Sequence, residues 1–203
     1  GKTGWNHSIS AYYTGIIGKW KIDFDADYLN NREAENQIAE DESRQDIHSH
    51  TNSSSKLYAA KLQASISLGK GKLSFGSEGT ITERIAIFTQ SGYSADAHDL
   101  IKQKSLAGFA NYAVSFGNWK ANAGVRYEHR ETDYYDEGIR VAQQSPTYND
   151  FIPTASLSWA DNGLGLSLSY RMMKTYPTYF LLSNAISYRN QYEYKTGNPL
   201  LEP

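Results

Sequence analysis

Several common features are missing from this 203-residue sequence. Cysteine is absent, which excludes a disulfide framework and any thiolate metal site. No run of about 18 apolar residues occurs, so no transmembrane helix is predicted. The formal net charge is only -2, and no basic excess favours nucleic-acid binding. The first residues lack the basic and apolar regions of a secretory leader. The alternation of polar and apolar residues is already under way at the first residue and is not completed at the last, which predicts that the chain is a piece of a larger protein.

Aromatic residues and glycine are plentiful instead. The chain holds 16 Tyr, 4 Trp and 16 Gly, although only 39% of its residues are hydrophobic. Many apolar positions carry alanine, glycine or an aromatic ring, and leucine, isoleucine and valine are thinly spread. A soluble β-sandwich of this length needs a thicker aliphatic core. The composition therefore raises the question of which medium the apolar positions face.

The clearest pattern is an alternation of apolar and polar residues over residues 105–130. Apolar side chains occupy even positions from Leu106 to Phe116 and odd positions from Trp119 to Tyr127. Between the two runs lies Gly117-Asn118, a dipeptide suited to a two-residue hairpin turn. A period of two places one set of side chains on each face of a sheet. The segment is predicted to form a β-hairpin with one apolar and one polar face.

The same alternation recurs along the chain and predicts an all-β fold, an antiparallel up-and-down meander of about nine strands. The remaining strands are expected over residues 8–13, 20–28, 58–68, 73–82, 151–159, 164–171 and 187–194. Short turns near residues 16, 70, 118 and 162 alternate with long polar connections over residues 31–55, 84–103, 131–148 and 172–186. In a meander this puts every short turn on one rim. Transmembrane β-barrels show that asymmetry.

Aromatic residues on the apolar face have a regular spacing. Trp20, Trp119 and Trp159 each lie within two residues of a short turn. Eight residues along the same strands lie Tyr28, Tyr127 and Phe151, respectively. At about 3.3 Å per residue and a strand tilt near 40°, eight residues span about 20 Å of height, close to the apolar band of about 25 Å in outer-membrane barrels. These six residues are predicted to form two aromatic girdles.

The polar face of the same strands is predicted to line the interior of a barrel, while the apolar face contacts lipid. The candidate interior residues are Lys21, Asp23, Asp25, Lys61, Gln63, Glu78, Asn122, Arg126, Glu128 and Arg171.

Three segments resemble a known family. Residues 192–203 (YEYKTGNPLLEP) resemble the Y-x-x-G-N-P-x-L-x-P segment in the barrels of TonB-dependent outer-membrane receptors, in the form found in the Bacteroidetes outer-membrane β-barrel family. Residues 124–128 (GVRYE) resemble its G-L-R-Y-E strand, and residues 151–158 (FIPTASLS) its F-P-S-x-S-L-S strand. The glycine-asparagine-proline segment is the most specific of the three.

This resemblance implies that residues 1–203 are part of a receptor barrel of about 22 strands. It also implies a plug domain and a TonB box upstream, further strands downstream, a location in the bacterial cell outer membrane and no enzymatic activity. The full protein is expected to take up a saccharide, a peptide or a chelated metal. Its expected partners are outer-membrane lipid, the plug, the TonB energy-transducing complex and a surface lipoprotein. The unpaired edges of an isolated piece would favour edge-to-edge self-association.

Other classes of function stay open on the residues alone. A soluble β-sandwich or barrel that binds carbohydrate through exposed tyrosines is the main alternative, and a glycoside hydrolase using Glu128 or Asp136 is a further one. The aspartates at positions 23, 25 and 27 lack the rest of a calcium loop, and His48 and His50 are two ligands where a metal needs three or four. A solvated strand face and exposed histidines are the favoured interpretations, so neither a metal nor a cofactor is predicted.

Overall fold

The fold is almost entirely β-structure in a computed structural model that describes residues 1–39, 47–91, 96–176, 187–190, 193–195 and 197–198. Within these ranges the single helical element is a three-residue 3-10 turn, η1 (Ala142–Gln144). None of the described helical structure is long and apolar enough to cross a membrane.

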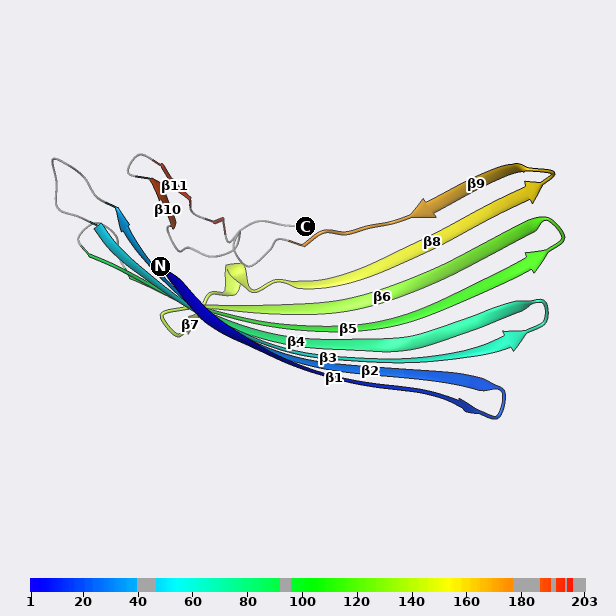
Figure 1. Ribbon diagram of the computed structural model, residues 1–203, viewed down its shortest axis with the longest axis horizontal. Coiled ribbons are helices and arrows are strands. Elements are labelled where there is room, and N and C mark those ends of the chain that lie inside the picture. The colour runs from blue at the N-terminus through cyan, green and yellow to red at the C-terminus, as the bar shows by residue number, and fades with distance from the viewer. Residues whose placement is uncertain (40–46, 92–95, 177–186, 191–192, 196, 199–203) are drawn as a thin grey trace.

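Eight long or medium strands lie side by side in chain order and bend together in one arc (Figure 1). They are β1 (Lys2–Ile17), β2 (Trp20–Ala39), β3 (Ile47–Leu68), β4 (Gly71–Gln90), β5 (Ala97–Phe116), β6 (Trp119–Asp136), β8 (Thr147–Asp161) and β9 (Leu164–Arg171). The short strand β7 (Ile139–Arg140) pairs with β6 and makes nine strands in this sheet. All pairings are antiparallel, so the predicted meander is confirmed.

Four two-residue turns connect these strands at one end of the sheet, on the right of Figure 1. Gly117 has a φ of +57° and Asn118 does not enter the positive region, as in a type II′ turn. Asn162 and Gly163 both have positive φ, 47° and 84°, as in a type I′ turn. Both turn types match the right-handed twist of paired strands, which is why such dipeptides close hairpins tightly.

Successive hairpins are staggered by a constant amount. One row of directly paired residues crosses the sheet and contains Lys21, Ser65, Ser74, Asn111, Gly124, Thr154 and Arg171. Along this row the distance to the end of the hairpin is one residue for β2, three for β3 and β4, five for β5 and β6, and seven for β8 and β9.

This stagger has a geometric consequence. An offset of one residue per strand, with about 3.3 Å of rise and about 4.8 Å between strands, corresponds to a tilt of about 35° if the four turns lie at one level. Strands of closed barrels tilt by about 35–45°. The pairing register is therefore that of a barrel wall.

The apolar face of the sheet is uncovered among the described residues. Leu62, Leu106 and Leu168 on that face are 49%, 63% and 75% exposed. The few buried apolar residues, among them Ile101 and Tyr134, lie on the opposite face. A soluble sandwich buries its apolar face under a second sheet, and the described chain has no such layer. The structure thus gives no support to the soluble alternative.

The long polar connections predicted over residues 31–55 and 84–103 are mostly strand where the structure describes them, and most of the one predicted over residues 172–186 lies outside the described residues. Residues 31–39 and 47–55 extend β2 and β3, and residues 84–90 and 97–103 extend β4 and β5. The period of two is lost in these segments, since polar residues occupy both faces over much of residues 31–39 and 47–55 and apolar residues occupy both faces over residues 85–88. The strand pairing nevertheless continues through them. The strand expected over residues 187–194 instead forms a separate hairpin of β10 (Ser187–Asn190) and β11 (Glu193–Lys195).

Candidate functional site

All ten residues proposed for the polar face lie on the same face of the sheet. The register pairs Asp25 with Lys61 and Asp23 with Gln63, and the pairings of the remaining strands continue this face across the sheet. Within each strand, every second residue lies on it. Three of the ten, Glu78, Arg126 and Glu128, are joined by ion pairs. Lys21 and Asp23 form a second pair, 3.0 Å apart. Asn122 and Arg171 make no polar contact with the others among the described residues.

Glu128 is the centre of the polar network. Its side chain is only 8% exposed and accepts hydrogen bonds from two guanidinium groups. Arg126 donates through Nε and Nη2 to Oε2 at 3.1 and 3.0 Å, and Arg130 through Nε and Nη2 to Oε1 at 3.2 and 2.7 Å. Ser105 adds a hydroxyl donor at 3.2 Å. Arg126 also reaches Glu78 at 3.3 Å, so the network links β4, β5 and β6.

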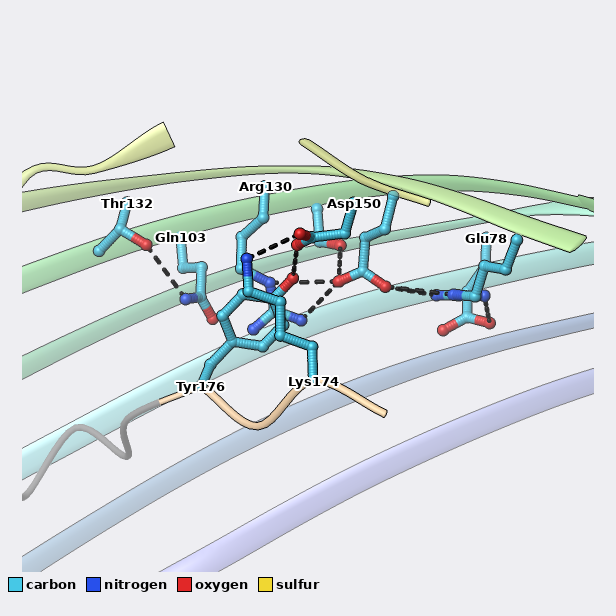
Figure 2. A network of polar contacts seen from close by, with 10 residues as sticks. Glu78, Gln103, Arg130, Thr132, Asp150, Lys174 and Tyr176 are labelled. Carbon is cyan, nitrogen blue, oxygen red and sulfur yellow. Dashed lines mark hydrogen bonds and ion pairs between the residues drawn. The ribbon is translucent and has the colours of Figure 1, made fainter. Parts of the chain in front are cut away.

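The chain after β9 continues away from the tight turns and lies over this face, as Figure 2 shows for Lys174 and Tyr176. The ammonium group of Lys174 lies 2.7 Å from Oδ1 of Asp150, and the hydroxyl of Tyr176 donates to Oδ2 of the same carboxylate. The Asp150 side chain is 11% exposed. Because one carboxylate on β8 holds two side chains of residues 172–176, it fixes that segment against the sheet. We call residues 172–176 the return segment.

Aromatic contacts strengthen this attachment. The guanidinium carbon of Arg130 lies 3.9 Å from the ring centroid of Tyr176, within the range of a cation–π interaction. The rings of Tyr148 and Tyr176 are 5.5 Å apart. Burial, and then the hydrogen bond to the negative Asp150, raise the pKa of Tyr176 above its ordinary value of about 10. The phenol therefore stays a hydrogen-bond donor at neutral pH.

A second polar cluster lies nearer the ends of β5 and β6. The hydroxyl of Tyr134 donates to Oδ1 of Asp99 at 2.6 Å, and both residues are 2% exposed. Gln103 donates to Thr132 at 3.1 Å on the same face. None of these residues was predicted, because their segments were interpreted as loops. If the alternation of residues 119–130 is continued past Arg130, it places Thr132 and Tyr134 on the polar face.

The return segment carried no local signal in the sequence. Lys174 and Tyr176 contact residues about 25 to 45 positions earlier, and only the three-dimensional fold brings them together. Arg130, by contrast, continues the alternation of Arg126 and Glu128 and was recognisable as a charged position of the same face.

The residues considered for metal binding lie apart from one another. Asp23 accepts from Thr14 at 2.8 Å and Asp27 from Ser10 at 2.6 Å. His50 contacts Asn36, and the backbone of His48 donates to Ser91 at 3.0 Å. In the part of the chain that the structure describes, no three histidine or carboxylate side chains converge on one point.

The six residues proposed as aromatic girdles fall into two groups along their strands. Trp20 and Trp119 each begin the strand that follows a tight turn, and Trp159 is the direct partner of Trp119. Trp20 packs edge-on against Phe75 at 5.6 Å. In the second group, Tyr28 lies opposite Tyr58, with ring centroids 5.0 Å apart, and Tyr127 lies opposite Phe151. With a tilt of about 35°, eight residues separate the two groups by about 22 Å.

An antiparallel sheet with the stagger of a barrel, one polar face and one exposed apolar face has the features of a transmembrane β-barrel wall. The sequence matches the outer membrane protein beta-barrel family over residues 18–203, and the chain belongs to this family. The protein is accordingly located in the bacterial outer membrane. No curated protein matches the sequence.

Solved structures with the same fold include two transporters and an uptake receptor. The copper transporter OprC superposes with a TM-score of 0.67 and 13% identity, over 86% of this chain and 31% of OprC. The ferric citrate transporter FecA gives 0.60 and 15%, over 78% and 25%, respectively. The ferric yersiniabactin uptake receptor FyuA from Yersinia pestis gives 0.59 and 12%, over 78% and 26%. At these identities the likeness shows the fold, and the chain spans about a quarter to a third of each structure.

Proposed function

We propose that this chain is part of the barrel wall of a TonB-dependent receptor that takes up a nutrient ligand across the outer membrane. The observation that carries the proposal is the one-sided sheet, whose register has the stagger of a barrel and whose apolar face is exposed. The similar structures are a ferric citrate transporter, an uptake receptor for ferric yersiniabactin and a copper transporter. The ligand of this receptor is a saccharide, a peptide or a chelated metal.

The ten polar-face residues then line the lumen, and the six aromatic residues mark the membrane boundaries. The network around Glu128 faces a plug domain supplied by another part of the full protein, and TonB provides the energy for uptake. The tight turns face the periplasm and the extended ends of β2 to β6 rise on the outer side, where a surface lipoprotein meets the ligand. The edges of β1 and β9 pair with neighbouring strands of the complete barrel, and in isolation they promote self-association.

Uptake by the full-length protein tests this proposal. Growth on single saccharides, on peptides and on iron or copper chelates is compared between the wild-type strain, a strain lacking this gene and a strain lacking tonB. We expect one ligand class whose use requires both genes. Fractionation should recover the full-length protein in the outer membrane, soluble only in detergent. Use of every ligand class without TonB, or a protein soluble without detergent, would overturn the proposal.

A further inference from the structure

A groove crosses the apolar face of the sheet. Its floor is a row of directly paired residues on β1 to β4 that have a small side chain or none, namely Ala11, Ala26, Ala60 and Gly79. The next row, farther from the tight turns, is bulky and holds Ile9, Tyr28, Tyr58 and Ile81. The groove has a volume of about 740 Å³ and an almost entirely apolar lining. It is therefore a slot for an apolar chain between rows of larger side chains.

The open edges of the sheet do not account for this groove. Each strand from β2 to β6 has a paired neighbour on both sides, so only the β1 end of the groove lies at an edge. A Cβ atom at Gly79 would come no closer than 3.9 Å to its neighbours, a methyl carbon of Leu106 and the carbonyl oxygen of Ser105. A larger residue would thus fit at position 79 in this structure, and its absence keeps the groove open.

The opposite end of the groove is polar, with Lys104, His129 and Glu131 in its lining. Lys104 and Glu131 are direct partners, but Oε1 of Glu131 lies 3.1 Å from Nε2 of His129. Lys104 is exposed and makes no hydrogen bond or ion pair with any residue that the structure describes. Because β4 and β6 are both present beside it, a further strand would not supply its partner. An ammonium group therefore stands unpaired where the apolar slot ends.

The groove also crosses the proposed outer boundary of the membrane. Tyr127 lies eight residues from the tight-turn end of its strand, whereas Lys104 lies 12 and Ala26 six residues from theirs. With about 3.3 Å of rise per residue and a tilt of about 35°, Lys104 is about 11 Å beyond the level of Tyr127, and Ala26 is about 5 Å short of it. One end of the groove is thus in the acyl layer and the other among the lipid head groups.

We propose that this groove binds a phosphate-bearing lipid of the outer leaflet, with an acyl chain along the small residues and the phosphate at Lys104. A lysine ammonium group forms a charge-assisted hydrogen bond with a phosphate, and the alanines and Gly79 leave room for the chain. A soluble protein would have to enter the acyl layer to reach Ala26, which favours a lipid as the occupant. The proposal rests on the orientation of the barrel wall and goes beyond uptake, since it involves neither the transported ligand nor TonB.

The test uses the full-length protein in detergent and lipid A, a phosphorylated glycolipid, as the probe. Native mass spectrometry during a titration counts the bound lipid molecules and gives their affinity. Lys104→Gln should weaken binding of lipid A about tenfold, because a charge-assisted contact is lost. The same variant should bind lipid A stripped of its phosphates as the wild type does. Lys72→Gln is the charge control, since Lys72 lies on the polar face of β4 and outside the groove; it should retain the affinity of the wild type.

Ala60→Leu fills the groove without changing any charge. It should weaken binding of both forms of lipid A about fivefold or more, because the slot is then overfilled. Ala110→Leu is its matched control, since Ala60 and Ala110 are both exposed alanines of the apolar face and only Ala60 lines the groove. Each variant is first shown to be folded by its heat-dependent shift on gels.

Equal affinity of the wild type and Lys104→Gln for lipid A would overturn the proposal. So would a loss in Lys104→Gln that persists with the lipid stripped of phosphate, or equal affinities of the two leucine variants. Each of these results is compatible with normal TonB-dependent uptake, which would leave the proposed receptor function standing. Conversely, a protein that binds lipid A as expected but supports no uptake would contradict only the receptor function.

Discussion

Trp119 lies directly opposite Trp159 on the neighbouring strands β6 and β8, with ring centroids 6.4 Å apart. Both side chains belong to the apolar face, close to the tight-turn end of the sheet. An indole ring prefers the membrane interface, where its apolar body meets lipid and its N–H stays hydrated. We therefore propose that the pair marks the inner limit of the lipid-facing band, and that Tyr127 and Phe151, also opposite each other, mark the outer limit.

A charge placed midway between these limits should be far more costly on the apolar face than on the polar one. Leu62 is the partner of Phe24, which lies four residues from both Trp20 and Tyr28. We expect Leu62→Arg to reduce the free energy of unfolding of the full-length barrel by about 2–4 kcal/mol, the cost of arginine at the bilayer midplane. Urea titration of the protein folded into lipid vesicles, followed by the heat-dependent shift on gels, measures this loss.

Gln63→Arg is the matched control for that experiment. Gln63 follows Leu62 on β3 but lies on the polar face, opposite Asp23. The same side chain there should change the free energy of unfolding by less than about 0.5 kcal/mol, as surface substitutions usually do. Comparable losses for the two variants would show that both faces meet the same medium, contrary to a barrel wall in lipid.

Glu128 should contribute more to stability than Glu78, although both accept from Arg126. The Glu128 side chain is 8% exposed and bonds two guanidinium groups, whereas that of Glu78 is 35% exposed and has a single contact at 3.3 Å. Glu128→Gln leaves two partly buried cations without their shared carboxylate and should cost about 2–3 kcal/mol. Glu78→Gln should cost less than about 1 kcal/mol.

Urea unfolding of the full-length protein in one detergent measures both carboxylate variants. A double variant carrying both substitutions tests their coupling, because Arg126 bridges the two carboxylates. A loss for Glu78→Gln as large as that for Glu128→Gln would contradict the assignment of Glu128 as the centre of the network.

Much of the fold could be predicted from the sequence because its information is local. Gly117 and Gly163 at the tight turns, and the alternation through Leu106 and Tyr127, depend on backbone geometry and on side chains two positions apart. The same alternation put the ten polar residues on one face. Strand ends could not be predicted in the same way. Beyond Tyr28 the residues are polar on both sides, so the period of two has no contrast, although β2 continues to Ala39.

The parts of the site that escaped prediction depend on contacts between distant residues. In the sequence, Asp150 is an ordinary polar residue next to a predicted strand. Nothing in the sequence around Tyr176 indicates that the tyrosine hydroxyl contacts the Asp150 carboxylate. The row of Asn111, Gly124 and Thr154 follows from the register of three strands, which a sequence alone does not give. The pairing register shows which residues of neighbouring strands lie side by side on one face, and only the structure gives this register.

Asp150 should control the docking of the return segment. Asp150→Asn removes the charge that holds Lys174, and we expect the free energy of docking to fall by about 1–3 kcal/mol, the usual value of hydrogen bonds to charged groups. The chain contains no cysteine, so Thr175→Cys provides a single labelling position within it. A nitroxide spin label there should become more mobile in Asp150→Asn, as measured by continuous-wave EPR.

Asp133→Asn is the control for this change of charge. Asp133 pairs with Arg140 at 2.7 Å, but both side chains are more than a third exposed and neither contacts the return segment. Mobility of the label at position 175 should stay as in the wild type. An immobile label in Asp150→Asn would show that the segment is held by other contacts.

High pH should release the return segment through Tyr176. Burial and the adjacent Asp150 raise the pKa of this phenol, so the docked state binds its proton more tightly than the undocked state does. The contribution of the hydroxyl to docking is therefore fully present below the ordinary pKa of about 10 and is lost as the pH rises through the raised pKa. The label at position 175 should therefore gain mobility as the pH rises above about 10.

Tyr176→Phe isolates the effect of the phenol, because phenylalanine keeps the ring over Arg130 and has no proton to lose. The pH dependence of release that comes from the phenol is absent in this variant, so release should be less steep than in the wild type. The absorbance difference at 295 nm between the wild type and Tyr176→Phe follows the phenol directly, and it should titrate above the ordinary tyrosine value. A difference spectrum with its midpoint near pH 10 would show that Tyr176 is solvated like a free phenol, and the bond to Asp150 would then have no part in holding the segment.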